Sequence, residues 1–316
     1  MKCVFIMCPL DQVVVDKDTS YALMLGARKR GHQVYHVKDG DLSLVNDKVF
    51  FHALSVTPKE DRLKPFEIED EIVLAGSDVD VVFIRTDPPF DESYLHTTWI
   101  LENLPPKVIV MNRPSGIRDV NEKIWVTKYP DLIPPTLITK NKREYLEFIE
   151  IYKEIIVKPT NGFGGASVFK LTEADSNKSV VFETLTKQGK EHVVIQKYLP
   201  ESQEGDKRIL LLNACPMGSV LRVHSEEDHR NNFFAGGKPE KTALNERDYE
   251  IIEKIRPELR DLGLYFVGID VIGGFLVEVN VTSPTGIQEI NRLENKHLED
   301  DVIAFAEDLV RSQTKV

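Results

Sequence analysis

Three short runs of the sequence, at residues 2–7, 79–84 and 108–111, are almost entirely apolar and rich in valine and isoleucine. A strand with one solvated face would alternate apolar and polar residues, so these runs predict strands that are buried on both faces. Residues 93–104 have a helical pattern, and Asp18 or Thr19 would cap an earlier helix that ends at Gly31 before a strand at 34–37. This order predicts an α/β domain with a parallel sheet, whose ligand sites lie at the carboxyl ends of its strands.

Length and charge exclude several classes of protein. A chain of 316 residues is too long for one ordinary core, so we expect two or three packed domains. Its formal net charge of -11 opposes binding to nucleic acid or to an anionic membrane. No stretch reaches the roughly 18 uninterrupted apolar residues of a membrane span. Three cysteines without metal-ligand spacing indicate a reducing compartment, and we expect a cytoplasmic protein.

The rest of the sequence divides into two smaller units. The first begins near Asn121 with an expected helix over 121–129, followed by strands at 155–157, 166–171 and 193–196 and a helix at 180–187. The second has strands at 209–212 and 220–223, a helix at 249–262, and two closing strands at 266–272 and 276–281. We therefore expect an α/β domain over 1–121, a small α+β subdomain over 122–199 and a third subdomain over 200–316.

A glycine-rich loop with the sequence KPTNGFGGAS, at 158–167, joins two expected strands. Its glycines, Gly162, Gly164 and Gly165, would let backbone N–H groups close around phosphate oxygens, which Lys158 would neutralise. A plain hairpin turn that needs positive φ would explain the same glycines. The loop matches neither the Walker sequence nor the dinucleotide fingerprint.

The two closing strands carry a candidate metal site. A period of two places Glu278 and Asn280 on one face of the second strand, and a carboxylate with an amide two residues on suits Mg²⁺ shared with phosphates. A half-solvated strand would show the same alternation. Asp270 can oppose Glu278 only if the hairpin has a three-residue connection, at 273–275, or a bulge. We predict such an odd-length connection because two glycines permit it.

Two further candidates follow along the chain. The sequence QKYLP at 196–200 leaves a strand at an expected domain boundary, where free backbone groups would read an adenine edge and Asp206 would accept a ribose hydroxyl. A linker with a surface ion pair is the alternative. The polar stretch at 222–237 is typical of a lid whose arginines, Arg222 and Arg230, meet anions, or of a charged surface loop.

The first domain offers one candidate at a strand end. Arg85 follows the buried run at 79–84 and would hold a carboxylate bidentately, while the two prolines after it shape a turn and Asp91 caps the next helix. The polar residues at 16–21 start a helix and form either a cap or a ligand-facing N-terminus. The histidines lack metal-ligand spacing, and we assign no chemistry to the cysteines.

Lys123, the glycine-rich loop, the strand exit at 196–199 and the closing strands together resemble the ATP-grasp superfamily in their order and spacing. Within that superfamily, several stretches look like the bacterial glutathione synthetase family: KDTSYA at 17–22, RTDPPFD at 85–91, NEK at 121–123, GDKR at 205–208 and NVTSPT at 280–285. The resemblance covers nearly the whole chain. It departs mainly in the stretch at 222–237, which is acidic here where the family has a glycine-rich segment.

The resemblance implies an ATP-grasp fold behind an N-terminal Rossmann-like, or pre-ATP-grasp, parallel-sheet domain. It implies a homo-oligomeric ligase, tetrameric or dimeric, that joins γ-glutamylcysteine to glycine with ATP and Mg²⁺, or with Mn²⁺ in its place. It also implies ATP contacts by Lys123, Lys158, Gly162, Gly164, Gly165, Gln196, Lys197, Tyr198, Leu199, Asp206 and Asn280, and metal ligation by Asp270, Glu278 and Asn280. The resemblance further implies that the catalytic residues are Arg208, Arg222 and Arg230. It implies that the substrates are bound by Arg85, Asp87, Asn232, Ser283 and Thr285.

These residue types suit such a ligation. An amine does not attack a carboxylate directly, so transfer of the γ-phosphoryl group would first give an acyl phosphate with a good leaving group. The reaction needs cations, alignment and exclusion of water rather than a protein nucleophile. Two alternatives stay open: an ATP-grasp carboxylate–amine ligase with another acceptor, and a non-catalytic ATP-binding protein on the same fold.

Overall fold

The first sheet contains the buried strands that the sequence predicts. The computed structural model describes residues 1–224 and 236–313. Its first sheet has the order β3-β4-β2-β1-β6-β7, with β5 paired to β4. Four of its strands run parallel, namely β1 (Lys2–Met7), β2 (Gln33–Lys38), β6 (Val81–Ile84) and β7 (Ile109–Met111). The prediction of a parallel α/β sheet is confirmed for this half of the sheet.

The other half of the first sheet is antiparallel. β4 (Lys48–Pro58) pairs antiparallel with β2, β3 (Leu42–Val45) and β5 (Phe66–Ala75). These antiparallel strands, which extend the predicted parallel sheet, were not predicted from the sequence. β5 is exposed along most of its length and carries four acidic residues, so it lacks the apolar run that marks a buried strand.

Helices cover both faces of this sheet. Phe5 of β1 belongs to a core cluster shared with α1 (Thr19–Lys29) and α8 (Leu298–Gln313). The next residue, Ile6, belongs to a second cluster shared with α2 (Glu92–Leu101) and α3 (Pro114–Asp119). Because successive side chains of a strand point to opposite faces, each pair of helices covers one face. The predicted caps are present: Asp18 accepts from the Tyr21 N–H at 2.7 Å, and Asp91 accepts from the Tyr94 N–H at 2.9 Å.

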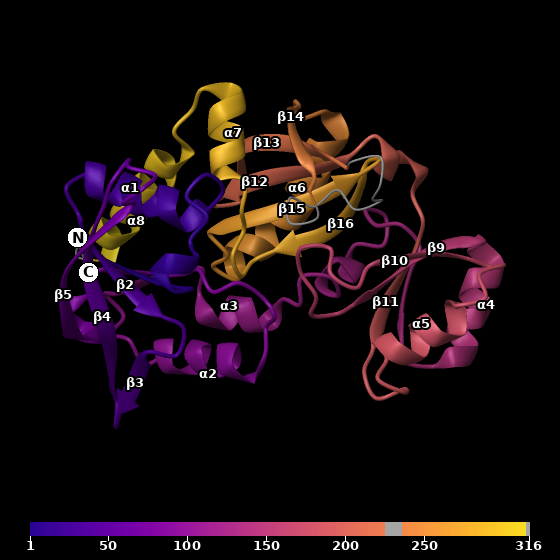
Figure 1. Ribbon diagram of the computed structural model, residues 1–316, viewed down its shortest axis with the longest axis horizontal. Coiled ribbons are helices and arrows are strands. Elements are labelled where there is room, and N and C mark those ends of the chain that lie inside the picture. The colour runs from indigo at the N-terminus through magenta and orange to yellow at the C-terminus, as the bar shows by residue number, and fades with distance from the viewer. Residues whose placement is uncertain (225–235, 314–316) are drawn as a thin grey trace.

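The last helix returns to the beginning of the chain. The carboxylate of Glu307 in α8 accepts two hydrogen bonds from Arg30, at 2.9 and 2.8 Å, and contacts the His32 Nε2 at 2.7 Å. As a result, the N-terminus and the end of α8 lie at the same end of the molecule (Figure 1). The first and last segments of the sequence therefore share one hydrophobic core.

The second sheet is small and antiparallel. Its order is β10-β9-β11-β8, with β8 (Thr136–Thr139), β9 (Glu154–Pro159), β10 (Phe169–Thr172) and β11 (Val193–Lys197). α4 (Lys142–Tyr152) and α5 (Lys178–Leu185) pack on it through a core that includes Tyr145 and Phe182, whose rings stack at 4.5 Å. The sequence predicted β9, β10, α5 and β11, but it missed β8 and α4.

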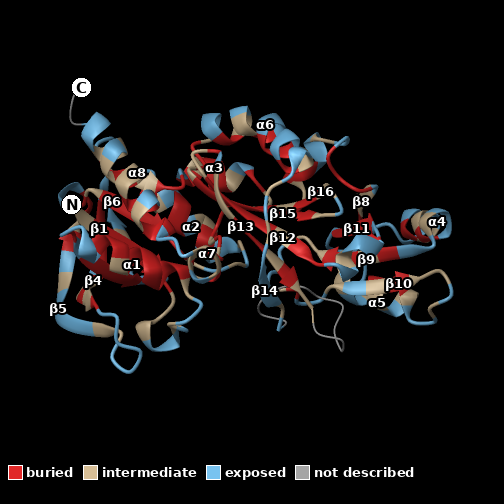
Figure 2. Ribbon diagram, turned by 90° about the horizontal axis from the view of Figure 1, so that it is seen from above, coloured by how far each residue is buried: buried red, intermediate tan, exposed pale blue. Residues whose placement is uncertain are grey.

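The third sheet is antiparallel and lies between the other two in Figure 1. Its order is β14-β13-β12-β15-β16, with β12 (Asp206–Leu212), β13 (Cys215–Val223), β14 (Lys238–Lys241), β15 (Phe266–Ile272) and β16 (Phe275–Asn280). α6 (Glu246–Asp261) and α7 (Ile287–Glu294) belong to this part of the chain. Figure 2 shows that buried residues are concentrated in the strands and in the inner sides of the helices around them.

The expected helix over 121–129 is wrong. Only η3 (Trp125–Lys128), a single 3₁₀ turn, forms there. The side-chain oxygen of Asn121 accepts hydrogen bonds from the N–H groups of Lys123 and Ile124, at 3.1 and 3.0 Å, as a helix cap would. The residues after this cap form i→i+3 hydrogen bonds, from Thr127 to Ile124 and from Tyr129 to Val126, so the segment continues as a 3₁₀ turn and not as an α-helix. Lys123 is instead turned toward the glycine-rich loop, where its ammonium donates to the carbonyl of Gly162.

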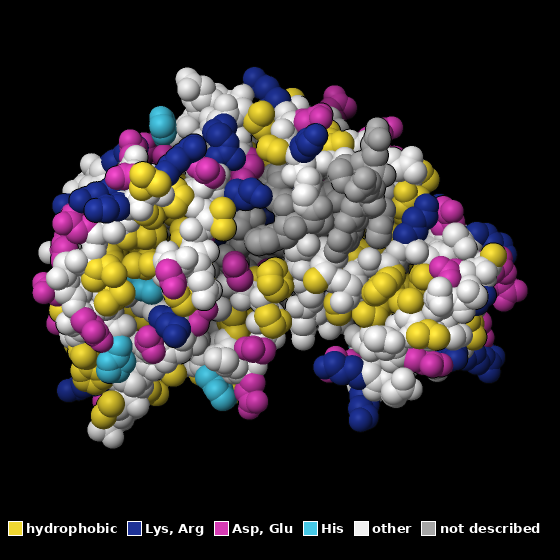
Figure 3. Space-filling model, viewed as in Figure 1, with side chains coloured by type: hydrophobic (Ala, Val, Ile, Leu, Met, Phe, Trp, Pro, Cys, Tyr) yellow, Lys and Arg dark blue, Asp and Glu magenta, His cyan; other side chains and the backbone are white. Residues whose placement is uncertain are grey.

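Charges of both signs are interspersed on the face that Figure 3 shows. Within the described residues, no helix has the length and apolar character that crossing a membrane requires.

Candidate active site

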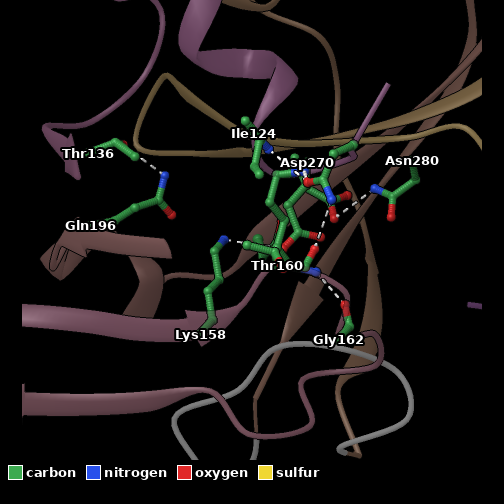
Figure 4. Close-up of polar contacts among 12 residues, drawn as sticks. Ile124, Thr136, Lys158, Thr160, Gly162, Gln196, Asp270 and Asn280 are labelled. Atoms are coloured by element: carbon green, nitrogen blue, oxygen red, sulfur yellow. Dashed lines mark hydrogen bonds and ion pairs between the residues drawn. The ribbon is translucent and has the colours of Figure 1, made fainter. Parts of the chain in front are cut away.

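The second and third sheets face each other across a cavity, which we call the nucleotide cavity. It is lined by side chains from several strand ends: Lys158 of β9, Gln196 of β11, Tyr198 and Leu199 of the following linker, Asp206 of β12, Asp270 of β15 and Glu278 of β16. In Figure 4, the Lys158 ammonium points toward the centre of the site, where Asp270 and Asn280 meet. The structure therefore brings together residues from the separate motifs that the sequence singled out.

A bulge sets the register of the hairpin that carries the candidate metal ligands. Ile272 pairs with Phe275 across a two-residue turn, and Val271 pairs with Leu276. The register then shifts, so that Asp270 pairs with Glu278. The turn has two residues rather than three, but the predicted pairing of Asp270 with Glu278 is confirmed through the bulge. The extra residue in β16 turns both carboxylates to the same face of the sheet.

Asp270 is buried and held by two arginines. Its carboxylate accepts from the Arg208 Nε at 2.5 Å and from the Arg208 Nη2 at 2.9 Å, and the Arg222 Nη2 lies 3.1 Å away. Asn280 donates to the same carboxylate at 3.3 Å. Burial alone would raise the pKa of the Asp270 carboxyl, but the two guanidinium groups hold that pKa below its usual value. Asp270 is therefore a full anion at neutral pH.

Glu278 is paired with lysine. Its Oε1 lies 3.2 Å from the Nζ of Lys158, which is itself buried. Burial would raise the pKa of the Glu278 carboxyl, and the charges of Lys123 and Lys158 outweigh it and lower that pKa. Two carboxylates are thus kept ionised in one buried region by four cations, Lys123, Lys158, Arg208 and Arg222.

Asp206 differs from these two carboxylates. Its Oδ2 accepts from the Arg222 Nη2 at 2.5 Å, while its buried Oδ1 has no hydrogen-bond partner among the described residues. Burial outweighs the attraction of Arg222 and raises the pKa of Asp206 to about 6. A buried oxygen without a partner, on the wall of a cavity, is a ready acceptor for a ligand hydroxyl.

The glycine-rich loop closes one side of the site. Gly162 and Gly164 line a smaller cavity with Arg208, Arg222 and Asn280, which we call the junction cavity. A Cβ at Gly162 would lie 2.7 Å from the Pro159 Cγ, and Gly164 has a φ of +61°, so neither position suits a larger residue.

The strand exit at 196–199 supplies fewer free backbone groups than the sequence predicts. The N–H groups of Lys197 and Tyr198 donate to the carbonyls of Pro135 and Glu154, at 2.9 and 3.0 Å. The expectation that they are free is therefore wrong. The side chain of Gln196 donates to Thr136 at 3.1 Å, as Figure 4 shows, and Lys197 is exposed.

A third cavity, which we call the inner cavity, lies between the first sheet and the chain after β16. Arg85, Asp87, Ser283 and Thr285 line it, as the sequence predicts for a substrate site. Asp87, Ser283 and Thr285 also line the junction cavity. Glu278 lines both the nucleotide cavity and the junction cavity, so each of the three cavities adjoins the next.

The residues that could hold a divalent metal are Asp270, Glu278 and Asn280. In the part of the chain that the structure describes, no three His, Cys, Asp or Glu residues gather into a metal-holding group. The set here has two carboxylates and one amide, all hard oxygen donors on neighbouring strands. Mg²⁺ bound together with substrate phosphates commonly takes only one or two protein carboxylates, so the donor set fits it.

Comparison with known proteins identifies the family. Residues 1–118 match the model for the prokaryotic glutathione synthetase N-terminal domain, and residues 122–295 match the model for the prokaryotic glutathione synthetase ATP-grasp domain. The chain belongs to the prokaryotic glutathione synthetase family. The resemblance predicted from the sequence is thus confirmed.

Individual family members are similar over nearly their whole length. The glutathione synthetase of Mesorhizobium japonicum is 43% identical, with 90% of each chain covered. That of Gloeobacter violaceus is 40% identical, with 98% of each covered, and that of Escherichia coli K12 is 39% identical, with 92% of each covered.

Solved structures confirm the ATP-grasp fold. A D-cycloserine synthetase superimposes with a TM-score of 0.69 at 13% identity, covering 97% of this chain and 99% of the other. The ATP-grasp ligase PsnB, complexed with a precursor variant, Mg and ADP, gives a TM-score of 0.64 at 16% identity, covering 97% and 98%.

Not every predicted residue of this family member can be placed. Arg230 and Asn232 lie outside the described residues. Two carboxylates, the partly buried Glu122 and the buried Glu289, had no predicted role. Glu122 accepts from the N–H of Val281 at 2.8 Å and from both the N–H and the hydroxyl of Thr282, and so fixes the chain beyond β16. Glu289 lines the inner cavity. The hydrogen-bond partners of Glu122 lie about 160 residues away, and most residues that share the inner cavity with Glu289 come from the first 87 residues, so the sequence alone did not indicate either role.

Proposed function

We propose that this protein performs the reaction of its family, the ATP-dependent ligation of γ-glutamylcysteine and glycine to glutathione, through an acyl phosphate. The observation that carries the proposal is the set of four cations around two ionised carboxylates where the nucleotide and junction cavities meet. Phosphoryl transfer needs this combination, since charge spreads over the transferred group and must be balanced by fixed cations.

In this proposal ATP lies in the nucleotide cavity. Its adenine contacts the segment Gln196, Lys197, Tyr198 and Leu199, and a ribose hydroxyl donates to Asp206. This is supported by Asp206, which lines the cavity and whose Oδ1 has no hydrogen-bond partner among the described residues. Lys123 and Lys158 bind phosphate oxygens, and the loop with Gly162, Gly164 and Gly165 covers them.

Asp270, Glu278 and Asn280 would hold Mg²⁺, or Mn²⁺ in its place. The metal would add positive charge at the phosphate oxygens and so make the γ-phosphorus easier to attack. Before it binds, Arg208, Arg222 and Lys158 balance the charge of the same carboxylates. Those cations are released toward the phosphates once the carboxylates take a new partner.

The reaction takes place in two steps at the junction cavity, phosphoryl transfer and then attack by the amine. The cysteinyl carboxylate oxygen attacks the γ-phosphorus, the bond to the β-phosphate oxygen breaks, and ADP leaves. The glycine amine then attacks the acyl carbon, inorganic phosphate leaves with the bonding electron pair, and the amine loses a proton. Arg208 and Arg222, together with Arg230, stabilise the transferring group. Arg85, Asp87, Asn232, Ser283 and Thr285 hold the dipeptide and glycine.

We also propose that the protein acts in the cytoplasm as a homo-oligomer, a tetramer or a dimer. Its cysteines Cys3, Cys8 and Cys215 are free thiols, which suits a reducing compartment. Light scattering coupled to size-exclusion chromatography tests the oligomeric state, and a monomeric mass would overturn it.

ADP release with product mass analysis tests the reaction. With Mg²⁺ and ATP present, we expect ADP and a tripeptide only when γ-glutamylcysteine and glycine are both added. ADP without the tripeptide would point to another acceptor. Bound ATP without any turnover would support a non-catalytic ATP-binding protein.

A further inference from the structure

The end of β16 is held on its outer side by one residue, Glu122. β16 is the last strand of the third sheet, so the N–H groups on its outer side have no neighbouring strand in the described part of the chain. The Val279 N–H donates to the main-chain carbonyl of Glu122 at 2.9 Å. Beyond it, the Glu122 Oε1 accepts from the N–H groups of Val281 and Thr282, at 2.8 and 3.1 Å, and from the Thr282 hydroxyl at 2.9 Å. One side chain therefore satisfies three donors where the strand ends.

These contacts lie on both sides of Asn280, one of the proposed metal ligands. Its two neighbours in the chain, Val279 and Val281, both donate their N–H groups to Glu122. The Asn280 side chain donates to the Asp270 carboxylate at 3.3 Å, as Figure 4 shows. The position from which Asn280 reaches the metal site therefore depends on where Glu122 holds the main chain around it.

The residues beside Glu122 contact the glycine-rich loop. Lys123, which is 5% exposed, donates from its ammonium to the carbonyl of Gly162. Asn121 donates from its amide to the carbonyl of Thr160 at 3.3 Å. Three consecutive residues therefore join the glycine-rich loop of the second sheet to the end of β16 in the third sheet. No other covalent or strand-to-strand contact is needed to set the distance between the loop and the metal ligands.

We propose that Glu122 is a positioning residue for the metal and phosphate end of the nucleotide site. It holds the main chain around Asn280, while its neighbour Lys123 contacts the loop, so the proposed metal ligand and the proposed phosphate-binding cation keep a fixed separation. The proposal rests on the metal and phosphate assignments of the function proposed above, and it adds the residue that ties them together. Binding of Mg²⁺ and the phosphates then depends on Glu122, whereas binding of adenosine beside Tyr198 and Leu199 does not.

Binding measurements on Glu122→Ala test this role without any turnover. The ligands are adenosine and ADP with Mg²⁺, and isothermal titration calorimetry gives the dissociation constant of each. We expect the variant to bind adenosine as the wild type does. We expect it to bind ADP with Mg²⁺ about 10- to 100-fold more weakly, because the residues that hold the metal and the phosphates are no longer held in place.

Three other results of this experiment would each decide against a proposal. Equal binding of ADP with Mg²⁺ by the wild type and Glu122→Ala would overturn the positioning role and leave the ligase function intact. A loss for adenosine as large as that for ADP would show a general loss of structure, which also overturns the positioning role. Failure of the wild type itself to bind ADP with Mg²⁺ would instead contradict the proposed function.

Glu122→Gln separates the positioning role from a direct contact with a ligand, which is the alternative because Glu122 also lines the junction cavity. The amide oxygen of glutamine accepts the same hydrogen bonds, but the side chain carries no charge. We expect Glu122→Gln to recover most of the affinity for ADP with Mg²⁺ that Glu122→Ala loses. A loss as large as that of Glu122→Ala would show that the charge matters and the hydrogen bonds do not, and the positioning role would be wrong.

Glu258→Ala is the matched control. Glu258 of α6 also accepts three hydrogen bonds from side chains, and all three come from the segment just after Glu122: Trp125, Lys128 and Tyr129. Glu258 is not among the residues that line the three cavities. We expect this variant to lose unfolding free energy but to keep the wild-type affinity for ADP with Mg²⁺. A loss of that affinity as large as in Glu122→Ala would show that any loosening of the segment has the same effect, and would contradict a specific role for Glu122.

Discussion

Individual side chains in the nucleotide and junction cavities have their charges balanced before any ligand arrives. Asp270 is held by Arg208 and Arg222, and Glu278 by Lys158. Each of these pairs places a proposed phosphate-binding cation against a proposed metal ligand. Binding of ATP with its metal therefore exchanges partners rather than burying new charges, and this lowers the desolvation cost of assembling the reactive complex.

Glu278→Gln tests the metal assignment. The amide keeps the shape of the side chain but removes the charge that a divalent cation needs, so we expect turnover to fall by about 100-fold or more. The measurement is ADP release over a titration of Mg²⁺, in which the loss should persist at the highest concentration. Glu240→Gln, on the exposed strand β14, is the control and should behave as wild type. Near-normal turnover of Glu278→Gln would remove this residue from the metal site.

The raised pKa of Asp206 predicts a pH effect on nucleotide binding. If the ionised carboxylate accepts a ribose hydroxyl, affinity should be highest above pH 6 and should fall as the pH drops through about 6, the pKa of this group. Adenosine is the suitable probe, because it carries no phosphate that titrates in this range. The dissociation constant would be measured between about pH 5 and pH 8. Asp206→Asn should flatten the profile, and a flat profile for the wild type would contradict the assignment.

Helices and strands were predictable where their signals are local. The caps Asp18 and Asp91 need only a side-chain oxygen near the first free N–H groups, and the buried strands need only a continuous apolar run. Counting residues along the hairpin showed that Asp270 could oppose Glu278 only with a three-residue connection or a bulge, and the structure has the bulge. The helix expected over 121–129 was wrong although Asn121 has the contacts of a helix cap, because the turns after it are of the 3₁₀ type and Lys123 contacts a loop about forty residues away.

The candidate site was predictable only in part, for the same physical reason. For motifs on adjacent strands of one hairpin, the sequence limits the possible registers to a few. The convergence of Arg85 and Glu289 depends on how the first sheet packs against the third, and no short-range pattern encodes that packing.

Two hydrogen bonds from Arg30 to Glu307 attach α8 to the beginning of the chain. The hydrogen bond from Arg30 lowers the pKa of the Glu307 carboxyl to about 2, and His32 contributes further. The ionised carboxylate therefore stabilises the fold fully at pH values above about 4.5, the usual pKa of a glutamate. This stabilisation is lost as the pH falls from there through about 2. Glu307→Gln should cost about 1 kcal/mol at pH 7, and the difference from wild type should shrink below about pH 4.5. Urea unfolding at several pH values measures it.

Glu183→Gln is the matched control for that experiment. Glu183 makes one ion pair, with Lys142 at 2.7 Å, and both side chains are more than 40% exposed. We expect a much smaller change in unfolding free energy at any pH. A loss as large as that of Glu307→Gln would show that the two-bond contact with Arg30 stabilises the fold no more than an exposed ion pair does.

The molecule as a whole depends on contacts between its first and last segments. Leu298, Val302 and Ile303 of α8 are buried in the same cluster as Phe5 and Leu23. Removing residues 298–316 would expose that cluster, so we expect the shortened chain to bind the dye ANS and to lose cooperative thermal unfolding. Removing only residues 314–316 is the control. Cooperative unfolding of the shorter chain at the wild-type temperature would contradict this prediction.

The return of α8 to the first sheet also has a consequence for how the protein is made. A ribosome adds about 5–20 residues per second, so roughly 15 to 60 seconds pass between the emergence of β1 and the completion of α8. During that time this face of the first sheet is covered by α1 but not by α8, so the cluster that Phe5 and Leu23 share with α8 is only partly covered. The nascent chain is therefore a natural client for a chaperone that binds apolar surface, although the finished enzyme is not.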